Sequence, residues 1–249
     1  MFFSGGGRSK DAADTLEIAG RVVAVAFLKS PRARRITLRA DPAKGRVTVS
    51  YPRYGSLRRA QRFLQEKRDW LESRIARWPD SKPLVDGVTF PLEGRDVVIQ
   101  HVAHAPRTPE LIHTGALPQL RVGGPADMLS ARVEGWLRSR ARRMLTAETR
   151  QVASENGLGE RVTRISVRDT TSRWGSCNPH LGTFNYSWRL ICAPPLVRQA
   201  IVAHEVAHLV HRGHGPEFHA LADLFAGSTQ AQADTWLRAH GAGLHLIGR

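Results

Sequence analysis

Alternating apolar and polar residues near the front of the chain predict β-strands. A β-branched run covers 22–27, and charged and apolar side chains alternate over 35–39 and 46–50. The intervening Asp-Pro-Ala-Lys-Gly of 41–45 has turn composition. An antiparallel hairpin with one solvated face is therefore expected. Further short strands are expected over 85–92, 96–102 and 117–122.

Apolar residues at helical spacing predict two helices in the first two thirds of the chain. The first covers 56–78, with Ser56 as a favourable N-cap and an arginine-rich face opposite its apolar stripe. The second covers 125–155, and its buried stripe begins at Leu129. A charged helix face is usually only the solvated face, so the arginines alone do not establish a binding surface.

The last third combines two strands with a largely apolar helix. Strands are expected over 162–168 and 184–192, and the segment between them reads as a loop. The apolar helix begins after a pair of prolines, which are tolerated in a first turn, and covers about 196–211. Two shorter helices are expected over 216–226 and 230–240.

These elements indicate an α+β protein with a β-rich N-terminal half that holds one helix. The C-terminal half is expected to hold a small antiparallel sheet and a largely apolar helix. The expected division is a disordered tail over 1–15, a β-rich subdomain over 16–124 and a second subdomain over 125–249.

Composition restricts the class of protein and its partners. The net charge is +15, from 37 basic and 22 acidic residues, which favours attraction to nucleic acid or another polyanion as strongly as it favours mere solvation. No apolar run approaches the roughly 20 residues of a membrane helix, and residues 1–14 lack a signal-peptide core. The two cysteines, Cys177 and Cys192, form no disulfide framework. A cytoplasmic protein without membrane contact is expected.

The chemistry concentrates in one motif, His204-Glu205-Val206-Ala207-His208. Residues four apart on a helix lie on one face, about 6 Å apart along the axis, so both imidazoles can bind one zinc ion. Glu205 then stands beside the ion as a candidate general base. Polar residues on an otherwise apolar helix are costly unless they are used, which favours the catalytic interpretation. The helix also follows a β-segment, as in zincins, so the subdomain over 125–249 is predicted to be a zincin-like metallohydrolase.

The third ligand is open between three residues. His211 lies about 10 Å along the helix from His204, too far for a tetrahedral site on a straight helix. His214 is preferred, because Gly213 would let the chain turn back, and Glu217 is the runner-up. Metzincins share the His208–His214 spacing but need a later Met-turn, and no methionine follows position 144. Weaker candidates for supporting the ligands are His219, Asp223 and Asp234.

Several segments together resemble the YgjP-like metallopeptidase family, which is related to SprT-like and Wss-type zinc proteases. The matching segments are Arg-Trp-Gly-Ser-Cys at 173–177, Asn-Tyr-Ser-Trp-Arg-Leu-Ile at 185–191, Pro194, the motif at 204–208 and His-Gly-Pro-Glu-Phe at 214–218. The run from Ser30 to Trp78 also resembles the front half of the family, so the resemblance covers about residues 20–240.

The resemblance implies one zinc ion on His204, His208 and His214, with Glu205 catalytic. It also implies that segment 173–177 lines the cleft. Position 219, where the family commonly has Trp, is His in this chain. Candidate substrate-binding residues are Arg173, Trp174, Ser176 and Arg189. Core packing is the competing interpretation for Trp174.

The expected function is therefore zinc-dependent hydrolysis of peptide bonds in a peptide or protein. One alternative is a UTP-type nucleoside triphosphate pyrophosphatase, because some family members are described in this way. A second is a nucleic-acid-associated repair protease, with non-specific nucleic-acid contact through the arginine-rich faces. A non-enzymatic binding protein with structural zinc is disfavoured, because such sites usually have four protein ligands.

Overall fold

The computed structural model describes residues 10–113 and 115–249, with side chains from residue 14 onward. Its contacts divide the chain into two units, Met1–Pro79 and Asp80–Arg249, rather than at the expected boundary of 124/125. Residues 80–124 join the second unit because their strands share one apolar core with the helices that follow. In the described part of the chain, no helix is long and apolar enough to cross a bilayer.

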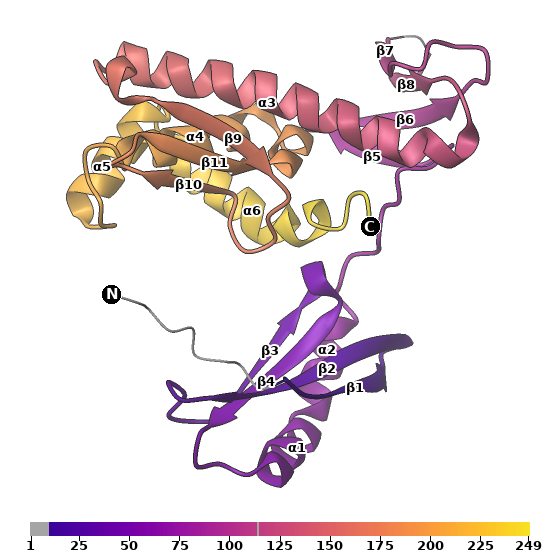
Figure 1. Cartoon of the computed structure of the whole chain (residues 1–249), viewed down its shortest axis with the longest axis vertical. Coiled ribbons are helices and arrows are strands. Elements are labelled where there is room, and N and C mark those ends of the chain that lie inside the picture. Colours follow the sequence, from indigo (N-terminus) through magenta and orange to yellow (C-terminus); the bar gives the residue numbers. More distant parts are fainter. Residues whose placement is uncertain (1–9, 114) are drawn as a thin grey trace, which may run out of the picture. The chain divides into compact units, whose positions relative to one another are not determined.

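The first unit is a four-stranded sheet in the order β1-β2-β4-β3 with two helices packed on it (Figure 1). Its elements are β1 (Lys10–Ile18), β2 (Arg21–Ser30), β3 (Thr37–Asp41), β4 (Arg46–Pro52), α1 (Leu57–Glu66) and α2 (Arg68–Ile75). A short 3₁₀ turn, Pro42–Lys44, joins β3 to β4. These two strands form the expected antiparallel hairpin, whereas β2 and β4 pair in parallel.

Alternation along the strands builds the core of this unit. Val47, Val49 and Tyr51 of β4 point inward, as the period of two in a half-buried strand requires. The helices close the core with residues that are each 6% exposed or less: Ala60, Leu64, Leu71 and Ile75. The single helix expected over 56–78 is two helices, because the backbone leaves helical geometry at Lys67 (φ −102°, ψ 14°).

From Lys10 onward, the structure differs from the disordered tail expected over 1–15. Residues 1–9 lie outside the described residues, and β1 begins at Lys10. This strand is polar and carries little apolar alternation, so its sequence gives a weak strand signal. Antiparallel pairing with β2 stabilises this strand through backbone hydrogen bonds, although the local sequence pattern does not predict it.

The second unit has two sheets joined by the longest helix. The first sheet, in the order β5-β6-β8-β7, contains β5 (Thr89–Leu92), β6 (Arg95–His101), β7 (Glu110–Ile112) and β8 (Gln119–Val122). After a 3₁₀ turn (Ala126–Met128), α3 (Leu129–Glu155), pink in Figure 1, contacts both β8 and β9 of the next sheet. A buried residue at every fourth position of α3, from Leu129 to Ala153, forms the stripe between the layers.

The second sheet has the order β10-β11-β9 and consists of β9 (Arg164–Arg168), β10 (Gly175–Asn178) and β11 (Thr183–Ser187). It is mixed, not antiparallel as expected: β11 pairs antiparallel with β10 and parallel with β9. The reason is β10, which forms inside the segment that reads as a loop and reverses the chain before β11. A 3₁₀ turn precedes β9 (Gly159–Arg161) and another follows β11 (Trp188–Cys192).

Three helices complete the second unit: α4 (Pro195–Ala207), α5 (Pro216–Phe225) and α6 (Gln230–Leu244). Helix α4 contacts α3, α5, α6 and β10, so it is enclosed on most sides. This central position explains its apolar sequence, and it places one polar edge of the helix beside β10. The chain is therefore a mixed α+β protein, as the sequence predicts.

Candidate metal centre

Helix α4 holds the His-Glu-His motif at its C-terminal end. Its first residue is a proline, and its buried face includes Val202, Ala203 and Val206. His208 is the C-cap and still has helical backbone angles (φ −64°, ψ −18°). The last turn tightens, because the amide of Leu209 donates to the carbonyl of Val206 three residues back. His204 and His208 therefore lie on one face of α4, and the chain leaves the helix axis after His208.

The loop after His208 brings His214 back over that face. Helix α5 begins at Pro216, and Phe218 in its first turn is 1% exposed. The Phe218 ring lies 4.4–4.8 Å, centroid to centroid, from the rings of His204, His208 and His214. Phe218 therefore forms an apolar floor that fixes all three imidazoles. Gly213 has no left-handed backbone angle, so the return does not depend on the conformational freedom of glycine.

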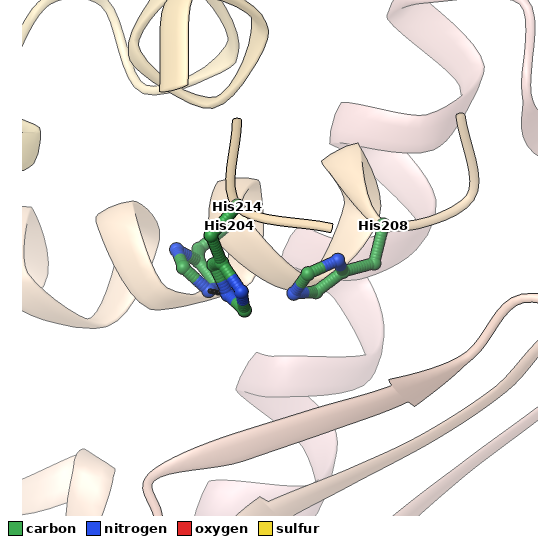
Figure 2. Close-up of side chains that lie close together, drawn as sticks. All are labelled: His204, His208 and His214. Atoms are coloured by element: carbon green, nitrogen blue, oxygen red, sulfur yellow. Dashed lines mark hydrogen bonds between the residues drawn. The ribbon is translucent and has the colours of Figure 1, made fainter. Parts of the chain in front are cut away.

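The three imidazoles converge on one point (Figure 2). One ring nitrogen from each of His204, His208 and His214 lies within 4.8 Å of the others, and no other such group of potential ligands occurs in the described ranges. The Nε2 atoms of His204 and His214 are 3.3 Å apart. Two neutral rings can make this contact as an N–H···N hydrogen bond, and with both nitrogens unprotonated the two lone pairs could instead bind one cation.

The protonation states suit a metal. Burial, followed by the neighbouring histidines, lowers the pKa of His204 to about 4, and burial also lowers the pKa of His208. Both rings are therefore neutral near pH 7, as a ligand must be. His208 Nδ1 lies 3.0 Å from the carbonyl oxygen of His211, which can only accept, so Nδ1 carries the proton and Nε2 keeps its lone pair. The three imidazoles of His204, His208 and His214 could therefore hold one metal ion.

Glu205 is the buried carboxylate of the site. It is 6% exposed, and burial raises its pKa to about 7 against the opposing effects of the Arg173 charge and a hydrogen bond from the Cys177 amide. Strand β10 approaches it closely. A Cβ atom on Gly175 would lie 2.6 Å from Glu205 Oε1, closer than two such atoms can stand. A carboxyl group that titrates near neutrality can both accept and return a proton.

An open cleft of about 700 Å³ gives access to these groups. Strand β10 and the preceding loop form one wall, and α4 with the loop after it forms the other. Its lining residues include the expected Arg173 and Ser176 together with Cys177, His180 and Arg212. Glu205 is the one carboxylate among the residues that line it.

The family profile described as "YgjP-like, metallopeptidase domain" matches residues 34–240. The chain belongs to the YgjP-like metallopeptidase family. Searches of curated proteins and of solved structures gave no match. The match extends from the first unit, near β3, to the last helix, so the YgjP-like domain includes the whole metal centre.

Two of the residues expected to bind substrate lie away from the cleft of this YgjP-like domain. Arg189 is 1% exposed, donates to the carbonyl oxygen of Ile247 and forms an ion pair with Asp169. Its neighbour Trp188 lies beneath its guanidinium group at 4.4 Å. Arg189 is therefore a buried structural residue, which corrects the expectation that it binds substrate.

Trp174 is the second of these residues. Its ring stacks on His245 at 4.1 Å with an interplanar angle of 8°, and it packs against the core. Its backbone carbonyl accepts a hydrogen bond from the amide of Ser187, at the end of β11. The packing interpretation of this tryptophan thus holds, while its neighbour Arg173 faces the cleft.

The remaining ligand candidates have other contacts. The Glu217 side chain is 86% exposed, and its Oε2 lies 3.9 Å from Nδ1 of His211. His211 contributes a backbone carbonyl to the site rather than its ring. Asp223 accepts a hydrogen bond from the amide of Gln230, and Asp234 pairs with Arg238. The His219 ring lies 6.2 Å from that of His214, close enough to affect the electrostatics of the cluster.

Neither cysteine is a candidate ligand or nucleophile. Burial raises the pKa of Cys177 to about 12, with the Glu205 charge as a second cause, and burial raises the pKa of Cys192 to about 12. Both thiols are therefore protonated at neutral pH, and Cys177 contributes to the site mainly through its backbone amide.

Sequence reasoning missed three contributors to the YgjP-like site. Gly175 makes room for Glu205, Phe218 supports the histidines, and Arg212 reaches the cleft beside His180, with 3.4 Å between Arg212 Nη2 and His180 Nδ1. The segments that carry the resemblance contain Gly175 and Phe218, so the sequence points to both residues but does not reveal what each one does. Nothing in the local pattern marks Arg212 or His180.

Gly175→Ala is expected to lower kcat by about tenfold to a hundredfold while metal binding is retained. The added methyl group would occupy the place of the Glu205 carboxyl group, and displacement by about 1 Å is enough for a loss of this size. Steady-state kinetics and zinc content of the purified variant test this. Gly135→Ala, on α3 with open space at its Cβ position, is the matched control and should keep wild-type kcat. Equal rates for both variants would contradict the assigned contact.

Proposed function

We propose that this chain is a zincin-type, zinc-dependent metallopeptidase that hydrolyses peptide bonds in a peptide or protein substrate. The observation that carries the proposal is the convergence of three imidazoles, from His204, His208 and His214, beside a buried carboxylate in an open cleft. Membership of a metallopeptidase family supports the same reaction class.

The chain's own groups have separable roles in this proposal. A bound zinc ion supplies a Lewis acid that polarises a carbonyl oxygen and lowers the pKa of water. His204, His208 and His214 would hold it, with the His211 carbonyl oxygen fixing the tautomer of His208. Glu205 takes a proton from the attacking water and returns it to the leaving amine. Gly175 and the Cys177 amide hold the Glu205 carboxyl group in position.

One observation favours a second candidate, hydrolysis of a nucleoside triphosphate of the UTP type. Arg173, Arg212 and His180 line the cleft, and Glu205 is its one lining carboxylate. Guanidinium groups bind phosphates with two parallel hydrogen bonds, so this cleft favours an anionic substrate. An acidic peptide would meet the same electrostatic requirement.

A panel of substrates tests the proposal. The zinc-loaded protein is incubated with casein, with casein plus single-stranded DNA, and with nucleoside triphosphates, and Glu205→Gln serves as the blank. Casein cleavage that a zinc chelator abolishes is the expected result. Cleavage of triphosphates alone would replace the peptidase proposal with the pyrophosphatase. Cleavage of casein only with DNA present would support the repair-protease alternative. No hydrolysis in any arm would leave the site as a structural metal centre.

A further inference from the structure

A second, strongly basic groove lies in the first unit, far along the sequence from the metal motif. Its volume is about 1050 Å³, and it is bordered by the loop before β3, the loop between β4 and α1, and α1 itself. Five exposed arginines line it: Arg34, Arg35, Arg58, Arg59 and Arg62. Glu66 is the one carboxylate among its lining residues. Within the described ranges, none of the five arginines forms an ion pair.

The arrangement of arginines on α1 does not serve the stability of the helix. Arg58 and Arg59 lie in its first turn, which has no acidic residue, although the helix dipole favours negative charge there. Arg58 and Arg62 are four residues apart and repel each other on the same helix face. An ordinary solvated face would mix charges of both signs. The unbalanced charge is explained if an anionic partner neutralises it.

An exposed aromatic ring distinguishes this groove from a simple charged surface. Tyr54, in the loop between β4 and α1, lines the groove and is 94% exposed. The guanidinium group of Arg53 lies 5.9 Å from the ring centroid, so one face of the ring already has a cationic neighbour. A tyrosine exposed to this extent contributes little to the core. It is suited to stacking on a flat, apolar partner.

We propose that this groove binds single-stranded nucleic acid, with phosphates on the arginines and a base stacked on Tyr54. Grooves that bind single strands combine positive charge along the backbone with aromatic stacking platforms. A duplex keeps its bases stacked internally and would leave Tyr54 unused. An anionic lipid surface would neutralise the arginines but offers no ring to stack on. The inference does not depend on the reaction at the metal centre.

Fluorescence anisotropy of the full-length chain with labelled oligothymidylate and oligouridylate of about 20 nucleotides tests the proposal. Binding that weakens as salt rises from about 50 to about 200 mM is expected, with a slope of log K against log salt of about −3 if most of the five arginines contact phosphate. The two oligonucleotides distinguish DNA from RNA as the source of the strand. Absence of binding to both at the lower salt overturns the proposal.

Variants separate stacking from charge. Tyr54→Ala should weaken binding about tenfold without changing the salt slope, because it removes a stacking partner and no charge. The double variant Arg58→Gln/Arg62→Gln should weaken binding about tenfold and make the slope shallower by about 1. Glutamine favours helices, so α1 should persist, and circular dichroism checks this. If the double variant unfolds, the Tyr54→Ala variant alone still tests whether a base stacks on Tyr54.

The control Arg142→Gln/Arg143→Gln removes the same charge from exposed positions on α3 in the other unit. It should bind as the wild type does. Equal weakening by both double variants would mean diffuse attraction through net charge and would overturn the site. Equal affinity for duplex and single strands, with no effect of Tyr54→Ala, would overturn the stacking. Binding to phosphatidylcholine–phosphatidylserine vesicles but not to oligonucleotides would replace nucleic acid with a membrane surface.

Discussion

Replacing Glu205 with glutamine is expected to lower kcat by about a thousandfold and to leave zinc bound. Glutamine has nearly the same shape, and its carbonyl oxygen can still accept the hydrogen bond from the Cys177 amide. It cannot take a proton from water at neutral pH. The close packing of Gly175 on this side chain should keep the replacement in the same position. Steady-state kinetics with the substrate identified by the panel, together with zinc content by mass spectrometry, measure both effects.

The matched control is Glu217→Gln, which makes the same chemical change on an exposed carboxylate close in sequence to His214. Its kcat should equal that of the wild type. Wild-type turnover by Glu205→Gln would show that another group handles the proton. Loss of zinc from Glu205→Gln would instead show that this carboxylate holds the metal site together, so the two failures are distinguishable.

The helices of the fold follow from local sequence more directly than the sheets do. In α3, the apolar residues at helical spacing from Leu129 onward predict the buried stripe, and the proline pair at 194–195 marks the start of α4. In contrast, β1, β7 and β10 lie in segments that read as a tail or as loops. These strands are short or polar, and their partners in the sheet create them. Strand direction likewise depends on β10, which the sequence pattern does not reveal.

The same distinction applies to the metal centre. Two histidines four residues apart on a helix define half of the site by helical geometry alone. The position of His214 depends on the packing of Phe218 under the rings, which involves two different helices. The role assigned to Arg189 failed because this buried side chain forms an ion pair with Asp169, which lies 20 residues earlier in the chain. Residue type suggested substrate binding, but only tertiary contacts show that the guanidinium group already has its partners.

The choice between His214 and Glu217 as third ligand has a measurable consequence. His214→Ala is expected to lower zinc affinity by at least about a hundredfold, because loss of even a group that merely supports a ligand costs about ten- to a hundredfold. Activity should fall with it at limiting zinc. Competition with a chromophoric chelator measures the affinity of each purified variant.

Two further variants decide whether this loss belongs to the His214 ring. Glu217→Ala should keep wild-type zinc affinity, because its carboxylate is exposed and faces His211 rather than the cluster. His211→Ala should also keep zinc, since the hydrogen bond to His208 uses the backbone carbonyl oxygen, which alanine retains. If Glu217→Ala lost zinc and His214→Ala retained it, Glu217 rather than His214 would be the third ligand. Such a result would require the loop after His208 to rearrange on binding, because the exposed Glu217 would have to turn toward His204 and His208.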